Sequence, residues 1–190
     1  MAIVSIKNKT KSGSLLVGNA YYFPNSYESI ATTTVGSGGT SSITFSSIPQ
    51  TFTHLQLRFL MVSSSASSSC FTYVNGDTTQ ANYKEHVLYG NGASASAGSY
   101  SNSYMPQFNG GAATTSPGSY ILDILDYTNT NKYKTLRGLG GYDGNGSGYL
   151  ALESMLWMNT AAITSLQFSP NAQTWSQYAN ISLYGIKAAS

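Results

Sequence analysis

Hydrophobic and polar residues alternate along much of the chain, most clearly in the stretch HLQLRFLM that begins at His54. Leu55, Leu57 and Phe59 occupy every second position, and His54 and Arg58 stand between them. A period of two predicts a strand with one buried face and one face in solvent. His54 and Arg58 are therefore expected on the outer side of a sheet, as solvent-facing residues or as part of a subunit interface.

Short segments of this kind recur from residue 27 to the end of the chain, separated by turn formers such as Asn75-Gly76 and Asn91-Gly92. Asn-Gly supplies the positive φ angles that tight hairpins need. No segment keeps the i, i+3, i+4, i+7 apolar spacing of a helix over about ten residues. The predicted strands are 29–35, 41–45, 53–61, 71–74, 86–89, 119–127, 132–137, 149–157, 163–168 and 180–186.

Many short strands without helices predict an all-β fold, and we expect an antiparallel, jelly-roll-like β-sandwich over residues 27–190 as a single domain. The segment YILDILDY at 120–127 does not alternate cleanly, so we expect a strand covered on both faces. Residues 90–117 are rich in Gly, Ala, Ser and Asn and predict a surface excursion.

Residues 1–26 are expected to form an extended N-terminal arm with two short apolar patches and a basic spacer between them. Such an arm cannot bury both patches alone, so we expect it to pack on its own domain or to dock on a neighbour as an extra strand. Its candidate partner-binding residues are Ile3, Ile6, Lys7, Lys9, Lys11, Leu15, Leu16, Val17, Tyr21 and Tyr22.

Charged residues make up 8% of the chain, against roughly 25% in ordinary globular proteins. No apolar run approaches the ~20 residues that span a bilayer, so no membrane partner is expected. Hydrophobic content of 41% and aromatic content of 13% are too high for a disordered chain. We favour a homo-oligomer or assembly component that hides much of its surface; a monomer with a polar Ser/Thr/Asn coat is the alternative.

The formal net charge of +2 comes from the arm, because Lys7, Lys9 and Lys11 are three of the nine basic residues, and the rest of the chain has six basic and seven acidic residues. Nucleic-acid recognition normally uses a basic face with stacking aromatics. That pattern is absent, so no nucleic-acid partner is expected. No secretory signal precedes the domain, which predicts synthesis in a cytoplasm.

No catalytic residue is expected. Cys70 is alone, which excludes an intrachain disulfide and a cysteine metal cluster. No serine has the G-x-S-x-G surroundings of a hydrolase nucleophile. Asp123 and Asp126 are three positions apart, so in a strand they would point to opposite faces and not form a carboxylate dyad. His54 and His86 are interpreted as solvent-side strand residues, His86 at a strand start.

One loop has a weak match to a metal site. Asp143, Asn145 and Ser147 occupy positions 1, 3 and 5 of a calcium-loop opening. The match then fails, because Ser154 stands where position 12 needs a bidentate carboxylate. A flexible hairpin is therefore the preferred interpretation, and no cofactor is expected.

Tyrosines are the remaining candidate chemistry. Tyr100, Tyr104 and Tyr142 join Tyr21 and Tyr22 as loop or arm residues that would stack on a glycan or anchor an interface. The alternative is that tyrosine is simply a good strand residue.

Five segments together resemble a widespread group of tailed-bacteriophage virion proteins. They are YESIATTT (27–34), ITFSSIPQTFTHLQLR (43–58), NGDTTQANY (75–83), DYTNTNKYKTLRG (126–138) and ISLYGIK (181–187). The resemblance implies a β-sandwich structural protein of the virion, assembled in the host cytoplasm. It points first to a capsid decoration (cement) protein that binds the major capsid protein and copies of itself. The alternative is a tail or fibre module that recognises a host-surface glycan.

Overall fold

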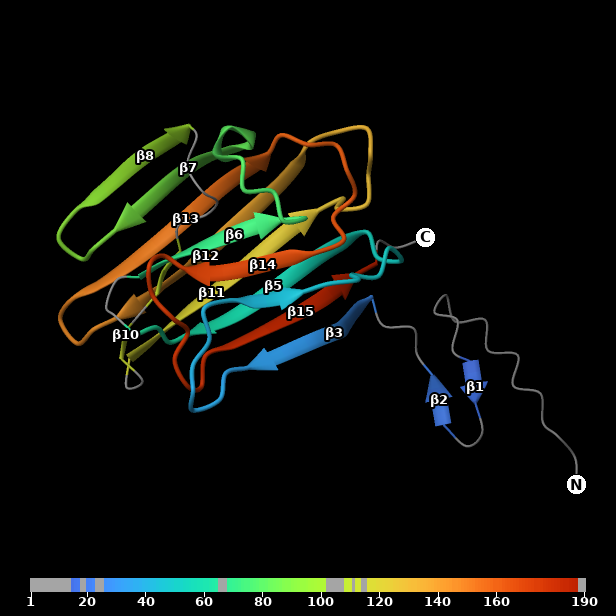
Figure 1. Ribbon diagram of the computed structural model, residues 1–190, viewed down its shortest axis with the longest axis horizontal. Coiled ribbons are helices and arrows are strands. Elements are labelled where there is room, and N and C mark those ends of the chain that lie inside the picture. Colours follow the sequence, from blue (N-terminus) through green and yellow to red (C-terminus); the bar gives the residue numbers. More distant parts are fainter. Residues whose placement is uncertain are drawn as a thin grey trace, which may run out of the picture.

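The computed structural model describes residues 15–17, 20–22, 26–64, 68–101, 108–110, 112–113 and 116–187, and nearly all their regular structure is β-strand (Figure 1). The strands are β1 (Leu15–Val17), β2 (Ala20–Tyr22), β3 (Tyr27–Thr34), β4 (Ile43–Phe45), β5 (His54–Met61), β6 (Ser68–Val74), β7 (Tyr83–Gly90), β8 (Ala95–Ser101), β9 (Phe108–Gly110), β10 (Ala112–Ala113), β11 (Ser116–Leu125), β12 (Lys134–Asp143), β13 (Gly148–Trp157), β14 (Leu166–Pro170) and β15 (Asn180–Ile186). A short 3-10 helix, η1 (Gln80–Asn82), precedes β7.

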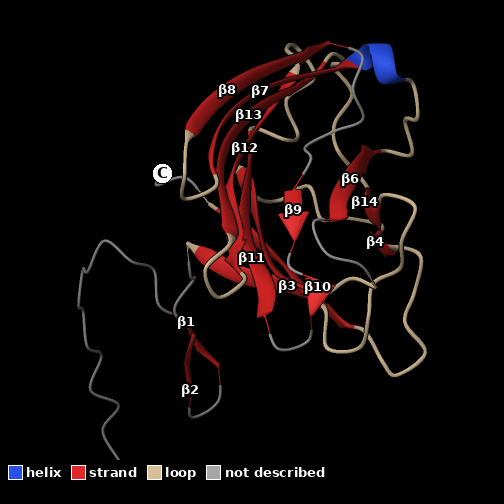
Figure 2. Cartoon of the chain, turned by 90° about the vertical axis from the view of Figure 1, so that its left-hand side faces the viewer, coloured by secondary structure: helices blue, strands red, loops and turns tan. Residues whose placement is uncertain are grey.

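The strands form two facing sheets (Figure 2). The large sheet has the order β3-β15-β5-β11-β12-β13-β7-β8, with β10 paired to β11, and the small sheet has the order β4-β14-β6-β9. Their strand pairs are antiparallel. Strands β1 and β2 form a separate hairpin, which Figure 1 draws beside the sandwich. The predicted antiparallel β-sandwich is confirmed.

The chain crosses between the sheets repeatedly, because β4, β6 and β14 of the small sheet each lie between strands of the large sheet in sequence. Such crossings are what a jelly-roll-like layout requires. The two sheets are unequal in size, however, so one long sheet is faced by a smaller one.

The core lies between the sheets and uses alternate positions of each strand. Leu55 and Leu57 of β5 are fully buried, as the alternating pattern predicts. Phe59 packs edge to face on Phe168 of the small sheet, with ring centroids 5.0 Å apart. Trp157 and Trp175 are also buried, which makes them core residues rather than binding platforms.

The segment NGDTTQANY builds the connection from β6 to β7 around Asp77. Its Oδ2 accepts hydrogen bonds from Trp157 Nε1 and Asn82 Nδ2, both at 2.8 Å, and its Oδ1 accepts one from the Thr79 amide at 2.9 Å. Partial burial acts to raise the pKa of Asp77, but these hydrogen bonds outweigh it and hold the pKa below its usual range. The segment therefore has a structural role.

The expectation for residues 120–127 is wrong in two respects. Ile121 and Leu125 are 40% and 42% exposed, so the strand is covered on one face only. Asp126 lies beyond the end of β11 with φ of 47°, so it belongs to a turn and the opposite-face argument for Asp123 and Asp126 does not apply.

The expectation for residues 90–117 is also wrong, because this stretch contains β8, β9 and β10 and enters both facing sheets. Its small side chains give no apolar period, and strand pairing with β7 and β6 organises it instead. His86 lies in the middle of β7 rather than at a strand start, and it is exposed.

Candidate interaction surface

The face of the large sheet that points away from the small sheet, called here the outer face, carries exposed apolar side chains. Ile121 on β11 lies opposite Leu139 on β12, Leu139 opposite Leu152 on β13, and Leu152 opposite Leu88 on β7. These four side chains, called the apolar row, are between 40% and 56% exposed. The solvated face of an antiparallel sheet is usually polar. The packing of the residues that the structure describes therefore gives no reason for the apolar row.

A hollow lies beside the apolar row. In the next row along the strands, Leu60 and Leu150 are exposed, and the small residues Ser119 and Gly141 stand between them. An open pocket of about 860 Å³ forms here, lined by these small residues, by Leu150 and by part of the apolar row. The outer face thus combines apolar protrusions with an adjacent depression.

Arg58 lies at the end of the apolar row in an aromatic cluster. Tyr27 and Tyr184 stack with ring centroids 4.8 Å apart, and the guanidinium carbon of Arg58 is 5.9 Å and 6.0 Å from their centroids. Gln56 accepts a hydrogen bond from the Tyr27 hydroxyl and donates one to Asp123, both at 2.8 Å. This network fixes the polar side chains that border the apolar row.

Charged side chains lie at the end of the apolar row and beside it. Arg58 is paired with Ile121 at one end of the row, Asp123 lies opposite Arg137 in the row beside it, and Lys84 stands further along β7. Asp143 lines the pocket on the other side. The outer face therefore has an apolar centre bordered by charges of both signs, which suits a partner surface with complementary charges around an apolar patch.

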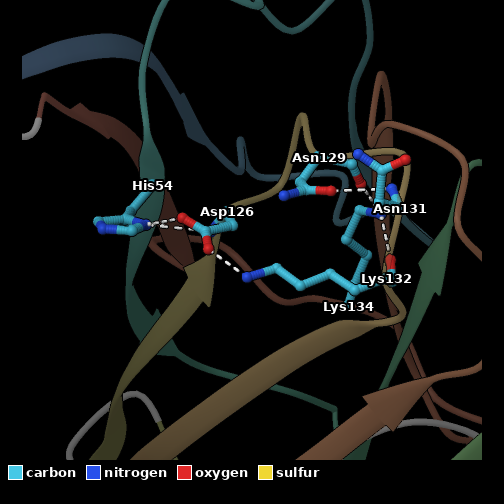
Figure 3. Close-up of polar contacts among 6 residues, drawn as sticks. All are labelled: His54, Asp126, Asn129, Asn131, Lys132 and Lys134. Atoms are coloured by element: carbon cyan, nitrogen blue, oxygen red, sulfur yellow. Dashed lines mark hydrogen bonds and ion pairs between the residues drawn. The ribbon is translucent and has the colours of Figure 1, made fainter.

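His54 packs against the turn that follows β11 (Figure 3). Its Nδ1 accepts a hydrogen bond from the Asp126 amide at 3.0 Å. The same Nδ1 lies 3.4 Å from Asp126 Oδ1. Lys132 donates to the same carboxylate and lowers the pKa of Asp126. His54 is thus a turn-packing residue.

Lys134 closes the same turn from inside (Figure 3). Its side chain is fully buried, and its Nζ donates to the carbonyl oxygens of Asn129 at 2.6 Å, Lys132 at 3.0 Å and Thr160 at 2.9 Å. Burial, with a contribution from Lys132, lowers the pKa of Lys134. The ammonium group has three hydrogen-bond donors, and each has a carbonyl acceptor, so Lys134 has a structural role.

Two buried carboxyl groups lie on the inner side of the large sheet. Glu153 on β13 is 1% exposed and Glu85 on β7 is 3% exposed. Tyr120 donates a hydrogen bond to Glu153 Oε2 at 2.7 Å, while Glu153 Oε1 has no hydrogen-bond partner among the described residues. Burial raises the pKa of Glu153 to about 8, the Tyr120 hydrogen bond opposes this, and the charge of Glu85 adds to it. Both groups are enclosed in the sandwich, away from the outer-face pocket.

Cys70 of β6 is buried next to this region. Burial raises the pKa of its thiol, so the thiolate is suppressed. This agrees with the interpretation of Cys70 as a structural thiol.

The candidate residues of the sequence do not gather in one place. Leu15, Leu16 and Val17 form β1, which pairs with Tyr21 and Tyr22 of β2. The expectation that Tyr100 and Tyr142 lie in loops is wrong, because Tyr142 is on β12 and Tyr100 is on β8, where it is 41% exposed at one edge of the large sheet. Ile3, Ile6, Lys7, Lys9, Lys11 and Tyr104 lie outside the described residues.

The weak calcium-loop candidate forms the hairpin between β12 and β13. Asp143 Oδ1 accepts a hydrogen bond from the Asn145 amide at 2.9 Å, and the Gly144 amide donates to the Ser147 carbonyl at 2.6 Å. One carboxylate oxygen of the candidate site is thus engaged in the turn. Across the described ranges, no group of three or more His, Cys, Asp or Glu side chains is placed to hold a metal ion.

Sequence reasoning missed both the apolar row and the buried carboxyl groups. A signal for Glu153 was present, because it is in phase with the buried Ala151, Met155 and Trp157 of its strand. Glu85 is likewise in phase with its buried neighbours on β7. For the apolar row, the alternation predicts which positions share a face, but the cross-strand register that brings them together comes from the structure.

A scan against protein-family models and a search of curated proteins each found no match for this chain. Within the described residues, no helix has the length and apolar character needed to cross a membrane.

Proposed function

We propose that this chain is a structural protein of a tailed-bacteriophage virion, and specifically a capsid decoration protein that binds the outer shell and bridges neighbouring capsid subunits. Its partners are the major capsid protein and further copies of itself, and it has no catalytic role. The observation that carries the proposal is the exposed apolar row on the outer face. The resemblance of five segments to virion proteins supplies the kind of assembly.

The energetics favour a covered outer face. Burying the exposed half of one leucine or isoleucine side chain contributes about 1 kcal/mol, so covering the apolar row is worth roughly 4 kcal/mol before association costs. The densely hydrogen-bonded sheet beneath the apolar row holds these side chains in fixed positions. A rigid platform loses little conformational freedom on docking, which suits a cement protein.

The test is co-sedimentation of the purified chain with empty shells assembled from the major capsid protein of the phage that encodes it. The informative variant combines Leu139→Lys with Leu152→Glu, two exposed residues in direct register. The pair leaves the net charge unchanged and places opposite charges across the strands, so the sheet should remain folded. We expect wild-type binding, and at least a tenfold loss of shell affinity in the variant.

The matched control makes the same exchange elsewhere, with Tyr133→Lys and Tyr178→Glu on exposed loop positions. It should bind shells like the wild type. A version lacking residues 1–18 shows whether the arm contributes. Failure of the wild-type chain to bind shells would refute the decoration function, and equal binding by both double variants would refute the role of the apolar row.

A second candidate function is a tail or fibre module that recognises a host glycan. The pocket beside the apolar row favours it, since Arg58, Asn91, Asp143 and Ser119 supply hydrogen-bonding groups around an apolar floor. Glycan-array binding that is lost on Arg58→Ala, in a chain that does not bind shells, would select this alternative.

A further inference from the structure

The two edges of the large sheet differ in how they are protected against pairing with another strand. At one edge, β3 pairs with β15 through a register shift, and Glu28 of β3 forms an ion pair with Lys187 at 2.6 Å. Bulges and charges are the usual devices that block edge pairing. At the other edge, β8 has the sequence ASAGSYS, with neither a charge nor a proline.

Strand β8 pairs with β7 over its whole length, from Gly90–Ala95 to Lys84–Ser101. No strand among the described residues pairs with its other edge. An uncharged edge strand of seven residues is a template for a further strand.

We propose that β8 is a self-association edge, on which β8 of a second copy pairs in antiparallel register to give a two-fold dimer with one continuous sheet. This inference deepens the proposed function, on whose self-association it rests, by naming the edge through which copies pair, and it is tested on the purified chain in solution.

The sequence of β8 is compatible with pairing to itself. With the two-fold axis at Gly98, Ala97 of one copy lies opposite Ser99 of the other, and Ala95 opposite Ser101. All of these side chains are small, and no like charges meet. The second copy is therefore a sterically and electrostatically compatible occupant.

Tyr100 supplies the anchor in this arrangement. Its ring lies along the strand over Gly98, where an added Cβ would come within 3.0 Å of the ring. In the paired strands the residue opposite Tyr100 is Ser96, whose small side chain leaves room for the 41%-exposed ring. The tyrosine that the sequence suggested as an interface residue thus lies on this edge, with its ring over Gly98 at the two-fold axis.

The experiment measures the mass of the full chain in solution by sedimentation equilibrium, from about 1 to 200 µM. We expect a concentration-dependent species of twice the 20.2 kDa chain mass. Combining Ala97→Lys with Ser99→Lys places like charges opposite each other across the dimer, and should raise the dissociation constant at least tenfold.

Two matched variants make the result specific. Ala97→Lys with Ser99→Glu changes the same positions but pairs opposite charges across the axis, so the dimer should persist. Thr32→Lys puts a lysine on the exposed β3 edge and should change nothing. The proposal is overturned by a wild-type chain that stays monomeric over the whole range, or by a dimer that the two lysines leave intact.

Failure here and failure of the virion proposal are distinguishable. A monomeric chain can still bind shells through the apolar row, and a dimer can form without any affinity for shells.

Discussion

Glu153 is the residue whose environment departs furthest from that of an ordinary surface carboxyl. It lies in the sandwich interior with one hydrogen bond, from Tyr120, and near the second buried carboxyl of Glu85. Since a buried carboxylate is expensive to leave ionised, the folded protein keeps a proton on this group at pH values where the unfolded chain has lost it.

The sign of the resulting pH dependence follows directly. The pKa of Glu153 is raised from 4.5 to about 8, so its contribution to stability is fully present below about pH 4.5 and is lost as the pH rises towards 8. We expect Glu153→Gln to unfold at a higher urea concentration than the wild type at pH 8, with the advantage shrinking towards pH 4.5. Between pH 4.5 and pH 8, the difference in the free energy of unfolding between this variant and the wild type should change by on the order of 3 kcal/mol.

Urea unfolding followed by tryptophan fluorescence at several pH values measures this difference. Asp143→Asn is the matched control, since Asp143 is exposed and the amide oxygen can still accept the hydrogen bond from the Asn145 amide. If the free energies of unfolding of the wild type and of Glu153→Gln differ by the same amount at every pH, the assignment of a raised pKa to Glu153 is contradicted.

At the scale of elements, the connection from β11 to β12 depends on an ammonium group. Lys134 satisfies three backbone carbonyls of the surrounding turns from a fully buried position. Lys134→Met keeps most of the side-chain volume but leaves these acceptors without their donor. We expect the free energy of unfolding to fall by about 3 kcal/mol, measured by urea denaturation.

Lys132→Met tests the alternative that any lysine in this turn matters. Its side chain is about half exposed and pairs with Asp126, so its removal should cost less than about 1 kcal/mol. Equal losses in the two variants would show that the buried carbonyl contacts of Lys134 are not what stabilises the turn.

The elements that sequence reasoning predicted well are those with strong alternation. The strand from Asn180 to Ile186 has the predicted bounds, and the buried set of Leu55, Leu57 and Phe59 is confirmed. Strand β8 was not predicted, because Ala, Gly and Ser give no alternation of apolar and polar residues. Its strand conformation depends on pairing with β7. The apolar row was not predicted for another reason. It joins side chains from four strands, and the sequence of one strand does not determine its register with strands distant in the chain.

At the scale of the whole molecule, the sandwich separates two kinds of surface. The core side of the large sheet is covered by the small sheet, and the outer face carries the apolar row. A β8–β8 dimer would keep both outer faces on the same side, because the two-fold axis of an antiparallel edge pair is perpendicular to the sheet. Such a dimer could engage one shell at two points, which strengthens binding without any new contact.

Because Cys70 is buried, chemical modification of its thiol reports when the sandwich opens. The thiol lies in β6, between the pairing partners β14 and β9, so a reagent reaches it when the small sheet separates. We expect an aromatic disulfide reagent to modify the native chain at least roughly a thousandfold more slowly than the urea-unfolded chain.

Cys70→Ala gives the blank for this reaction, and modification in native buffer as fast as in urea would show that the sandwich does not protect the thiol. If the thiol is protected, the rate of its modification in native buffer reports how often the two sheets separate. The modification rate of the Cys70 thiol therefore reports transient opening of the sandwich. It can be measured before and after the chain joins an assembly.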